Sequence, residues 1–236
     1  VSDANNCSGS ATATVLQPAT LSVALTATGV SCNGGSNGSI SAVTSGGTSP
    51  YAYLWNDNST SENRYTVSAG SYTVTVSDIN NCSATSLVTV SQPATAVSIQ
   101  TAGVTHINCY GGSTGTINVT AAGGTPAYTF TWNDGSNLPN RTNLQAGNYN
   151  ISVTDAQGCQ ASVTTVLNQP AQALKIDTLV VSDVLCHGTA TGAINTTVSG
   201  GTVPYSYNWS GGTTNANLTN ATAGNYLVTV TDNKGC

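Results

Sequence analysis

Residues 109–159 read CYGGSTGTINVTAAGGTPAYTFTWNDGSNLPNRTNLQAGNYNISVTDAQGC, and the same pattern occurs at 32–82 and at 186–236. In each copy the closing cysteine lies 50 positions after the opening one (82 − 32, 159 − 109 and 236 − 186). Equivalent tryptophans are 77 positions apart (132 − 55 and 209 − 132). A repeat of constant length predicts a tandem array of small folding units rather than one large domain.

Gln-Pro pairs mark the ends of the units. Proline has no N–H to give to a sheet ladder and restricts the residue before it, so it ends a strand. The chain opens on VSDANNC, which parallels VSDINNC at 76–82, and we therefore expect a window from a longer array. The predicted domains are 1–18, the C-terminal end of a preceding repeat; 19–93, repeat 1; 94–170, repeat 2; and 171–236, repeat 3, truncated before its last strand.

Apolar residues alternate with polar or small ones along several short runs. Tyr128, Phe130 and Trp132 form one such run, and Tyr149, Ile151 and Val153 form another. Alternation with a period of two predicts a strand with one buried face, and no window carries a helical period. Six or seven short strands per unit predict an all-β tandem array of Ig-like antiparallel β-sandwich domains. The core aromatics expected are Trp55, Trp132, Trp209, Tyr72, Tyr149 and Tyr226.

Charge is scarce, with four basic and nine acidic residues and a formal net charge of −5. Without a basic patch to neutralise phosphates, neither nucleic acid nor an anionic membrane surface is an expected partner. We also expect no membrane insertion. The surface must consist largely of Ser, Thr, Asn and Gly, which suits an extracellular location.

Several short motifs together resemble the SprB repeat of Bacteroidota cell-surface proteins. They are GGTSPYAYLW at 46–55, AGSYTVTVSD at 69–78, Cys82 and Gln92-Pro93. Later copies read GGTPAYTFTW and GGTVPYSYNW, and copy two departs because its proline lies one place upstream, at Pro126. The pattern is more distantly similar to PKD and fibronectin type III sandwiches.

The resemblance implies a large surface adhesin, associated with the outer membrane and exported by the type IX secretion system. In gliding members of that phylum such adhesins move along the cell surface and drive motility. We expect a rod-like stalk segment of such an adhesin or of an extracellular filament, with no enzymatic activity and no cofactor. Its partners would be further repeats of the same chain, and a surface or glycan ligand bound by a tip outside this window.

Two alternatives remain open for the function. One is a glycan- or protein-binding sandwich module, which would need exposed aromatic residues; the strand pattern leaves Tyr65 and Tyr110 free. The other is a spacer in a large secreted multidomain protein.

The cysteines occupy fixed positions in the units and form no CxxC pairs, which predicts disulfides in an oxidising location rather than a metal site. They are Cys7, Cys32, Cys82, Cys109, Cys159, Cys186 and Cys236. Pairing within a unit gives Cys32–Cys82, Cys109–Cys159 and Cys186–Cys236, with Cys7 bonded further upstream. Pairing between neighbours gives Cys32–Cys159 and Cys109–Cys236.

The number of strands bears on this choice. With seven strands the two cysteine loops of a unit lie at opposite ends of the sandwich, on the order of 20–25 Å apart. A disulfide needs Cα atoms within about 7 Å, so neighbours would pair. With six strands both loops would share one end and could pair within the unit. A linear string of domains needs termini at opposite ends, which favours pairing between neighbours.

Other candidate sites are weaker. An aspartate at the end of the Tyr149 strand and its equivalents is a possible calcium ligand, but a side chain capping its own turn is the expected role. His106 and His187 are expected in surface loops without catalytic partners. Asp177-Thr178-Leu179 resembles a Bacteroidota O-glycosylation signal, with Thr178 as the acceptor. The aspartates named above as possible calcium ligands are Asp3, Asp78, Asp155 and Asp232.

Overall fold

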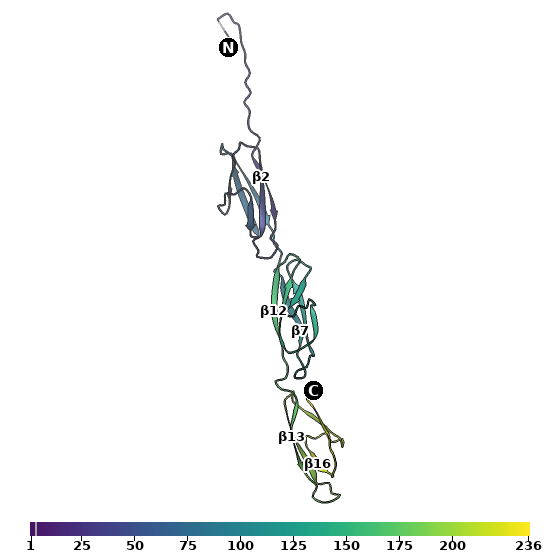
Figure 1. The fold of residues 1–236 in the computed structure, drawn as a ribbon. Helices are drawn as coiled ribbons and strands as arrows, with labels where there is room; N and C mark the ends of the chain where they lie inside the picture. Colours follow the sequence, from purple (N-terminus) through teal and green to yellow (C-terminus); the bar gives the residue numbers. More distant parts are fainter. Residues whose placement is uncertain (3) are drawn as a thin grey trace. The chain divides into compact units, whose positions relative to one another are not determined.

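The computed structural model describes residues 1–2 and 4–236, and in that part of the chain every regular element is a β-strand (Figure 1). The chain divides into two compact units, Val1–Ala96 and Val97–Cys236. The predicted all-β class is confirmed. No helix long and apolar enough to cross a membrane occurs among the described residues.

The first unit holds one sandwich. One sheet has the order β1-β2-β4 and the other has the order β3-β5-β6, and every pair is antiparallel. The strands are β1 (Ser22–Thr28), β2 (Gly38–Ser45), β3 (Ala52–Trp55), β4 (Arg64–Val67), β5 (Gly70–Ser77) and β6 (Ser83–Val90).

The second unit holds two copies of the same arrangement. Its sheets have the orders β10-β8-β7, β12-β11-β9 and β13-β14-β16, and a last sheet has only two strands, β15-β17. The strands are β7 (Ser98–Thr105), β8 (Gly115–Ala122), β9 (Thr129–Trp132), β10 (Asn140–Leu144), β11 (Gly147–Thr154), β12 (Gln160–Leu167), β13 (Lys175–Ser182), β14 (Gly192–Ser199), β15 (Ser206–Trp209), β16 (Leu218–Ala221) and β17 (Val228–Thr231).

The six strands of a repeat cross the sandwich only five times. β3 pairs with the second half of β5, whereas β4 pairs with the first residues of β2. β3 and β4 therefore each cover half the length of the sandwich, and they run in the same direction. Residues 56–63 connect them and pass from one sheet to the other. Because the crossings are odd in number, β1 enters at one end and β6 leaves at the other.

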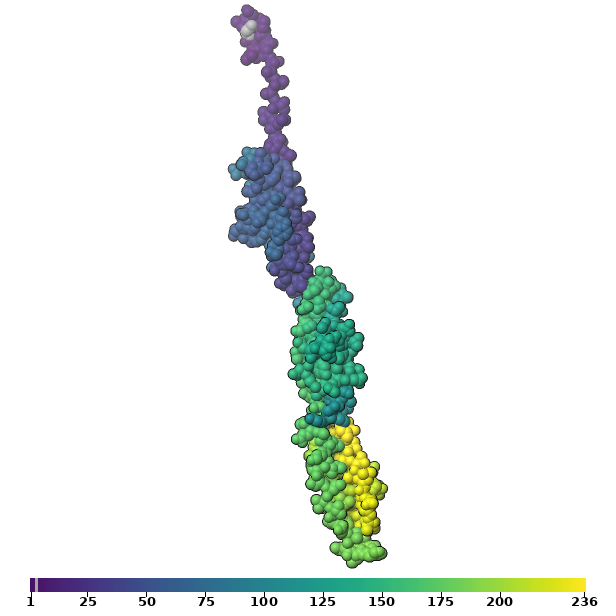
Figure 2. All heavy atoms as spheres, viewed as in Figure 1, coloured from purple at the N-terminus to yellow at the C-terminus, as the bar shows by residue number. Residues whose placement is uncertain are grey.

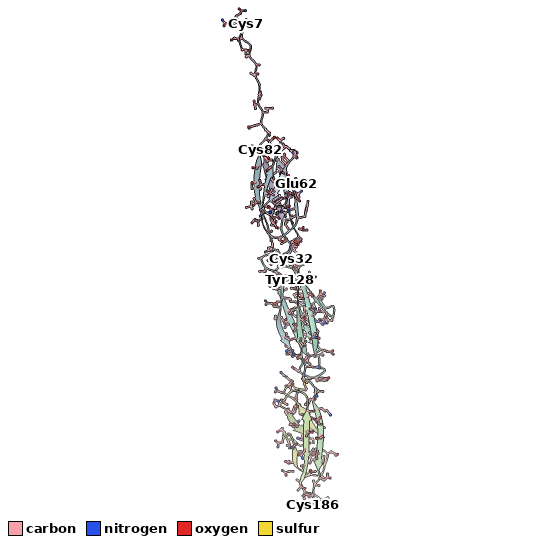
Figure 3. All side chains as sticks on the ribbon, turned by 90° about the vertical axis from the view of Figure 1, so that its left-hand side faces the viewer. Cys7, Cys32, Glu62, Cys82, Tyr128 and Cys186 are labelled. Carbon is pink, nitrogen blue, oxygen red and sulfur yellow. A yellow bond between two sulfur atoms is a disulfide. The ribbon has the colours of Figure 1, made fainter. Side chains whose placement is uncertain are left out.

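This path puts the two cysteine loops of a repeat at opposite ends. Cys32 follows β1, and Cys82 lies between β5 and β6. Figure 3 labels the two residues at opposite ends of the first sandwich. Strands of eight residues span about 27 Å, far beyond the reach of a disulfide. The expectation that six strands would place both loops at one end is wrong, because it counted strands rather than crossings.

Each core is built around one tryptophan. Trp55, Trp132 and Trp209 are 1–2% exposed, and each indole N–H donates to a backbone carbonyl six residues further on. In the first repeat Ile40 comes from one sheet, and Val74 and Val76 come from the other. Tyr72, Tyr149 and Tyr226 pack against these cores at their edges and donate to a carbonyl four residues back. The polar atoms of the aromatics are thus satisfied inside the fold.

Candidate functional site

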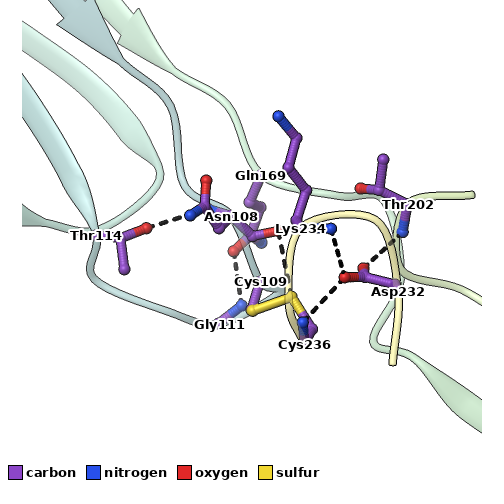
Figure 4. Close-up of a disulfide and its surroundings, with 9 residues drawn as sticks. All are labelled: Asn108, Cys109, Gly111, Thr114, Gln169, Thr202, Asp232, Lys234 and Cys236. Atoms are coloured by element: carbon purple, nitrogen blue, oxygen red, sulfur yellow. Dashed lines mark hydrogen bonds between the residues drawn. A yellow bond between two sulfur atoms is a disulfide. The ribbon is translucent and has the colours of Figure 1, made fainter. Parts of the chain in front are cut away.

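The junction between the second and third repeats is covalent. Cys109, in the loop between β7 and β8, is bonded to Cys236, which follows β17, with Cα atoms 5.6 Å apart (Figure 4). The two residues are 127 positions apart in sequence. The opening loop of one repeat is therefore tied to the closing turn of the next.

An aspartate organises the closing turn. Asp232 Oδ1 accepts the backbone N–H groups of Lys234 and Cys236, at 2.8 and 2.9 Å, and Oδ2 accepts that of Thr202 at 2.7 Å. In return the Asp232 N–H donates to the Cys236 carbonyl at 3.1 Å. One buried carboxylate thus holds both backbone polar groups of the bridging cysteine, and links its turn to the Gly-Gly-Thr turn before β15.

The same arrangement recurs in the other repeats. Asp155 accepts N–H groups from Thr125, Gln157 and Cys159, and Asp78 accepts from Thr48, Asn80 and Cys82. The hydrogen bond from Cys236 lowers the pKa of Asp232 and outweighs burial, which acts in the opposite direction. For Asp78 burial is the largest influence, yet its three N–H donors still bring the pKa below the usual value.

The opening loop is held by a glutamine from the end of its own repeat. Gln169 Oε1 accepts the backbone N–H of Gly111, two residues after Cys109, at 2.8 Å (Figure 4). Gln92 does the same for Gly34 in the first repeat, also at 2.8 Å. The glutamine of the Gln-Pro pair therefore positions the cysteine loop. A glutamine at one fixed place before every boundary proline is the sequence signal for this role.

The remaining cysteines differ in state. Cys82 and Cys186 are exposed thiols without a disulfide. Since Cys236 is bonded to Cys109, the pairs Cys109–Cys159 and Cys186–Cys236 within a repeat do not occur in this structure. Neither Cys32 nor Cys159 is free, and a bond between them stays a prediction.

The aspartates act as turn caps rather than as clustered ligands. Each carboxylate of Asp78, Asp155 and Asp232 is occupied by backbone donors, and no group of three or more His, Cys, Asp or Glu side chains that could hold a metal ion occurs in residues 1–2 and 4–236. Asp3, the fourth predicted position, lies outside the described residues.

The other predicted sites lie on the surface. His106 is exposed and its Nδ1 accepts the N–H of Asn168, and His187 is exposed beside Cys186. Thr178 is exposed on β13, and its hydroxyl lies 2.6 Å from that of Thr197. Tyr65 and Tyr110 are 72% and 51% exposed.

Solved structures with a similar arrangement share little sequence with this chain. Three N-terminal domains of the outer capsid protein Hoc of bacteriophage RB49 are 17% identical, with 80% of this chain and 74% of that chain covered and a TM-score of 0.41. Domains 3–5 of Drosophila OTK are 14% identical, with 86% and 89% covered and a TM-score of 0.31. A tetra-tandem repeat of a large adhesion protein is 16% identical, with 92% and 64% covered and a TM-score of 0.25.

No curated protein matches the sequence. The SprB repeat family model, however, matches three times, at residues 24–60, 101–137 and 178–214. Each match runs from the first strand of a repeat past its core tryptophan, and successive matches begin 77 residues apart (101 − 24 and 178 − 101). The SprB repeat therefore occurs three times along the chain, which confirms the resemblance found in the sequence.

Proposed function

We propose that this chain is a rod-like stalk segment of a large secreted bacterial cell-surface adhesin or extracellular filament. Residues 19–93, 94–170 and 171–236 act as successive Ig-like domains of the stalk. The partners of this segment are therefore further repeats of the same protein rather than a ligand.

The observation that carries this proposal is the bond between Cys109 and Cys236. It joins the opening loop of one repeat to the closing turn of the next, while each complete repeat has its entry and exit at opposite ends. A junction with one peptide connection bends freely, whereas a second covalent tie restricts it. Such a disulfide also supports an oxidising, extracellular location.

The test is small-angle scattering of the chain and of longer versions with one or two further copies of residues 94–170 inserted after Pro170. A stalk predicts a maximum dimension that grows by the same step with each inserted copy. Reduction should broaden the distribution of dimensions through bending at the junctions. A radius of gyration that grows as for a compact globule would contradict the proposal.

Association with the bacterial outer membrane, export by type IX secretion and a role in gliding motility form the finer part of the proposal. They are supported by the SprB repeats alone. Deleting the array from the parent protein in a gliding bacterium should leave secretion intact and slow surface movement.

A binding module is the second candidate function, because Tyr65 and Tyr110 expose their rings. Their equivalents are Thr142 and Thr219 for Tyr65, and Asn33 and His187 for Tyr110, so neither forms an aromatic row along the array. A glycan array probed with the whole chain distinguishes the two candidates. Binding that is lost in Tyr65→Ala or Tyr110→Ala would favour the module.

A further inference from the structure

We propose that tension along this chain passes from the second repeat to the third through β7 and the bond between Cys109 and Cys236, and bypasses the folded cores. These three parts, β7, Cys109 and Cys236, are called the load path below. Residues 110–235 hold the load path in place and carry no tension themselves. This role goes beyond the proposed stalk, because it depends only on the bond and on where β7 begins and ends.

The load path begins at the end of the second repeat that holds the closing turn. Val97 directly precedes β7. A Cβ added at Gly124 would lie 3.1 Å from Val97 Cβ and 2.3 Å from Asp155 Oδ2, and Asp155 is the carboxylate that caps the closing turn. Tension that reaches the repeat along residues 94–97 therefore enters β7 at this end.

The load path crosses the whole repeat in one strand. β7 has eight residues, which span about 27 Å. Beyond it, the Ile107 N–H donates to the Asn168 carbonyl at 2.9 Å, and the Gly111 N–H donates to Gln169 Oε1 at 2.8 Å. Cys109 lies between these two contacts in sequence, so it is held beside the residues that leave the repeat. One strand therefore joins the entry of the repeat to the disulfide at its exit.

The bond delivers the tension to the closing turn of the third repeat, which Asp232 caps (Figure 4). Figure 2 shows this transfer from outside, where dark teal atoms of the opening loop lie against yellow atoms of the closing turn. In the second repeat the equivalent cysteine, Cys159, is followed at once by β12, which leads to Gln169-Pro170. A closing cysteine thus hands tension to a last strand, and one strand again crosses the repeat.

Without the bond, the same tension would have to cross the core of the second repeat. β7 pairs with β8 and β12 pairs with β11, so the first and last strands belong to different sheets and share no ladder. Across the core the hydroxyls of Thr101 and Thr165 lie 3.2 Å apart. Side-chain contacts of this kind give way in forced unfolding, at a rate set by the unfolding barrier. A disulfide holds at forces that unfold such a core.

The bond sets a limit on how far the two ends of the load path can separate. The segment from Thr95 to Cys109 spans at most about 50 Å when it is fully extended, and the bridged Cα atoms are 5.6 Å apart. The two cysteines are 127 positions apart in sequence, which corresponds to about 450 Å of extended chain. The bond therefore withholds from tension a length of chain about nine times that of the segment that bears it.

Single-molecule force spectroscopy of the whole chain tests the load path. An azide-bearing amino acid in place of Thr95, which is exposed, and a peptide tag after Cys236 provide the two attachment points. Without reductant we expect no step that takes the distance between these points beyond about 50 Å. Reduction of the wild-type bond should release steps that add up to about 450 Å. Cys109→Ser should release the same steps without reductant.

A weakened core separates the load path from the fold around it. Trp132 is 2% exposed, and Trp132→Phe keeps an aromatic ring in the core but loses the indole hydrogen bond to the Leu138 carbonyl. In the bonded protein this variant should give the same force–extension curve as the wild type, because the core bears no tension. After reduction it should unfold at a lower force than the reduced wild type.

Cutting the chain outside the load path gives an independent readout. A protease site inserted between Gly211 and Gly212, where an added Cβ would meet no atom within 4 Å, lies between the two bridged cysteines in sequence. Cutting the bonded protein under load should leave the tether intact, whereas cutting Cys109→Ser should part it. Unfolding steps of the untreated wild type, or loss of its tether on cutting, overturn the proposal. Compact scattering would contradict the stalk alone, so the two failures are distinguishable.

Discussion

The carboxylate of Asp232 accepts the backbone N–H of Cys236, the residue that bridges the last two repeats, at 2.9 Å. The stability of the turn that carries the disulfide therefore depends on an ionised side chain. The same relationship joins Asp155 to Cys159 and Asp78 to Cys82. Each repeat thus presents its closing cysteine on a turn of the same construction.

Acid should destabilise the chain through these aspartates. The folded-state pKa values of Asp78, Asp155 and Asp232 are all lowered. Their contribution to the free energy of unfolding is therefore complete above the unfolded value of about 4, and is lost as pH falls through the folded values. Thermal unfolding followed from pH 7 to pH 2 should show a constant midpoint down to about pH 4 and then a steep fall.

Asp155→Asn isolates one of these groups. Asp155 Oδ1 accepts the backbone N–H groups of Gln157 and Cys159, and Oδ2 accepts that of Thr125. In the asparagine variant an NH₂ group replaces one of these oxygens and faces N–H donors, from which it cannot accept a hydrogen bond. The variant should unfold at a lower temperature at pH 7 and show a weaker dependence on acid. An unchanged pH profile would mean that folding does not shift the pKa of this carboxylate.

Removing the sulfur bond should loosen the last repeat. For a closed loop of 127 residues, the chain-entropy model gives up to about 5 kcal/mol. Cys109→Ser should lower the urea midpoint of the second unit when both proteins are compared without reductant. Cys186→Ser, which removes an exposed free thiol, is the matched control and should leave the midpoint unchanged.

The Gly-Gly-Thr turn should not tolerate a side chain. At Gly124 an added Cβ would lie 2.3 Å from Asp155 Oδ2, and φ is +61°. Gly124→Ala combines this clash with left-handed backbone strain of about 1–2 kcal/mol. Gly135→Ala, at φ +83° with no atom within 4 Å, carries the backbone strain alone. Equal losses of unfolding free energy for the two variants would show that the aspartate contact is not tight.

The core tryptophan should dominate the stability of its repeat. Trp132 is 2% exposed and its indole N–H donates to the Leu138 carbonyl at 2.7 Å. Trp132→Ala should cost about 3–5 kcal/mol. Trp132→Phe keeps an aromatic ring and loses the hydrogen bond, so its loss should be smaller. Urea unfolding of the two variants, followed by far-UV circular dichroism, measures the difference.

Much of the architecture follows from the sequence alone. The 77-residue period specifies the repeat, and alternation in runs such as Tyr149–Val153 specifies strands and their buried faces, because the side-chain period of a strand is two. The placement of Trp55, Trp132 and Trp209 in the cores follows for the same reason. Gly-Gly and Gln-Pro pairs mark the turns between these elements, because glycine readily adopts the positive φ of a turn and proline has no N–H to give to a sheet ladder.

Only the tertiary structure decided that Cys109 meets Cys236. The choice depends on which end of the sandwich each loop occupies, and that depends on β3 and β4 sharing one crossing between two sheets. Alternation shows that a strand exists but carries no information on its direction or on its partner sheet. The direction and the sheet of β3 and β4 are decided by their pairing with β5 and β2. These strands become neighbours only when the two sheets close over the tryptophan.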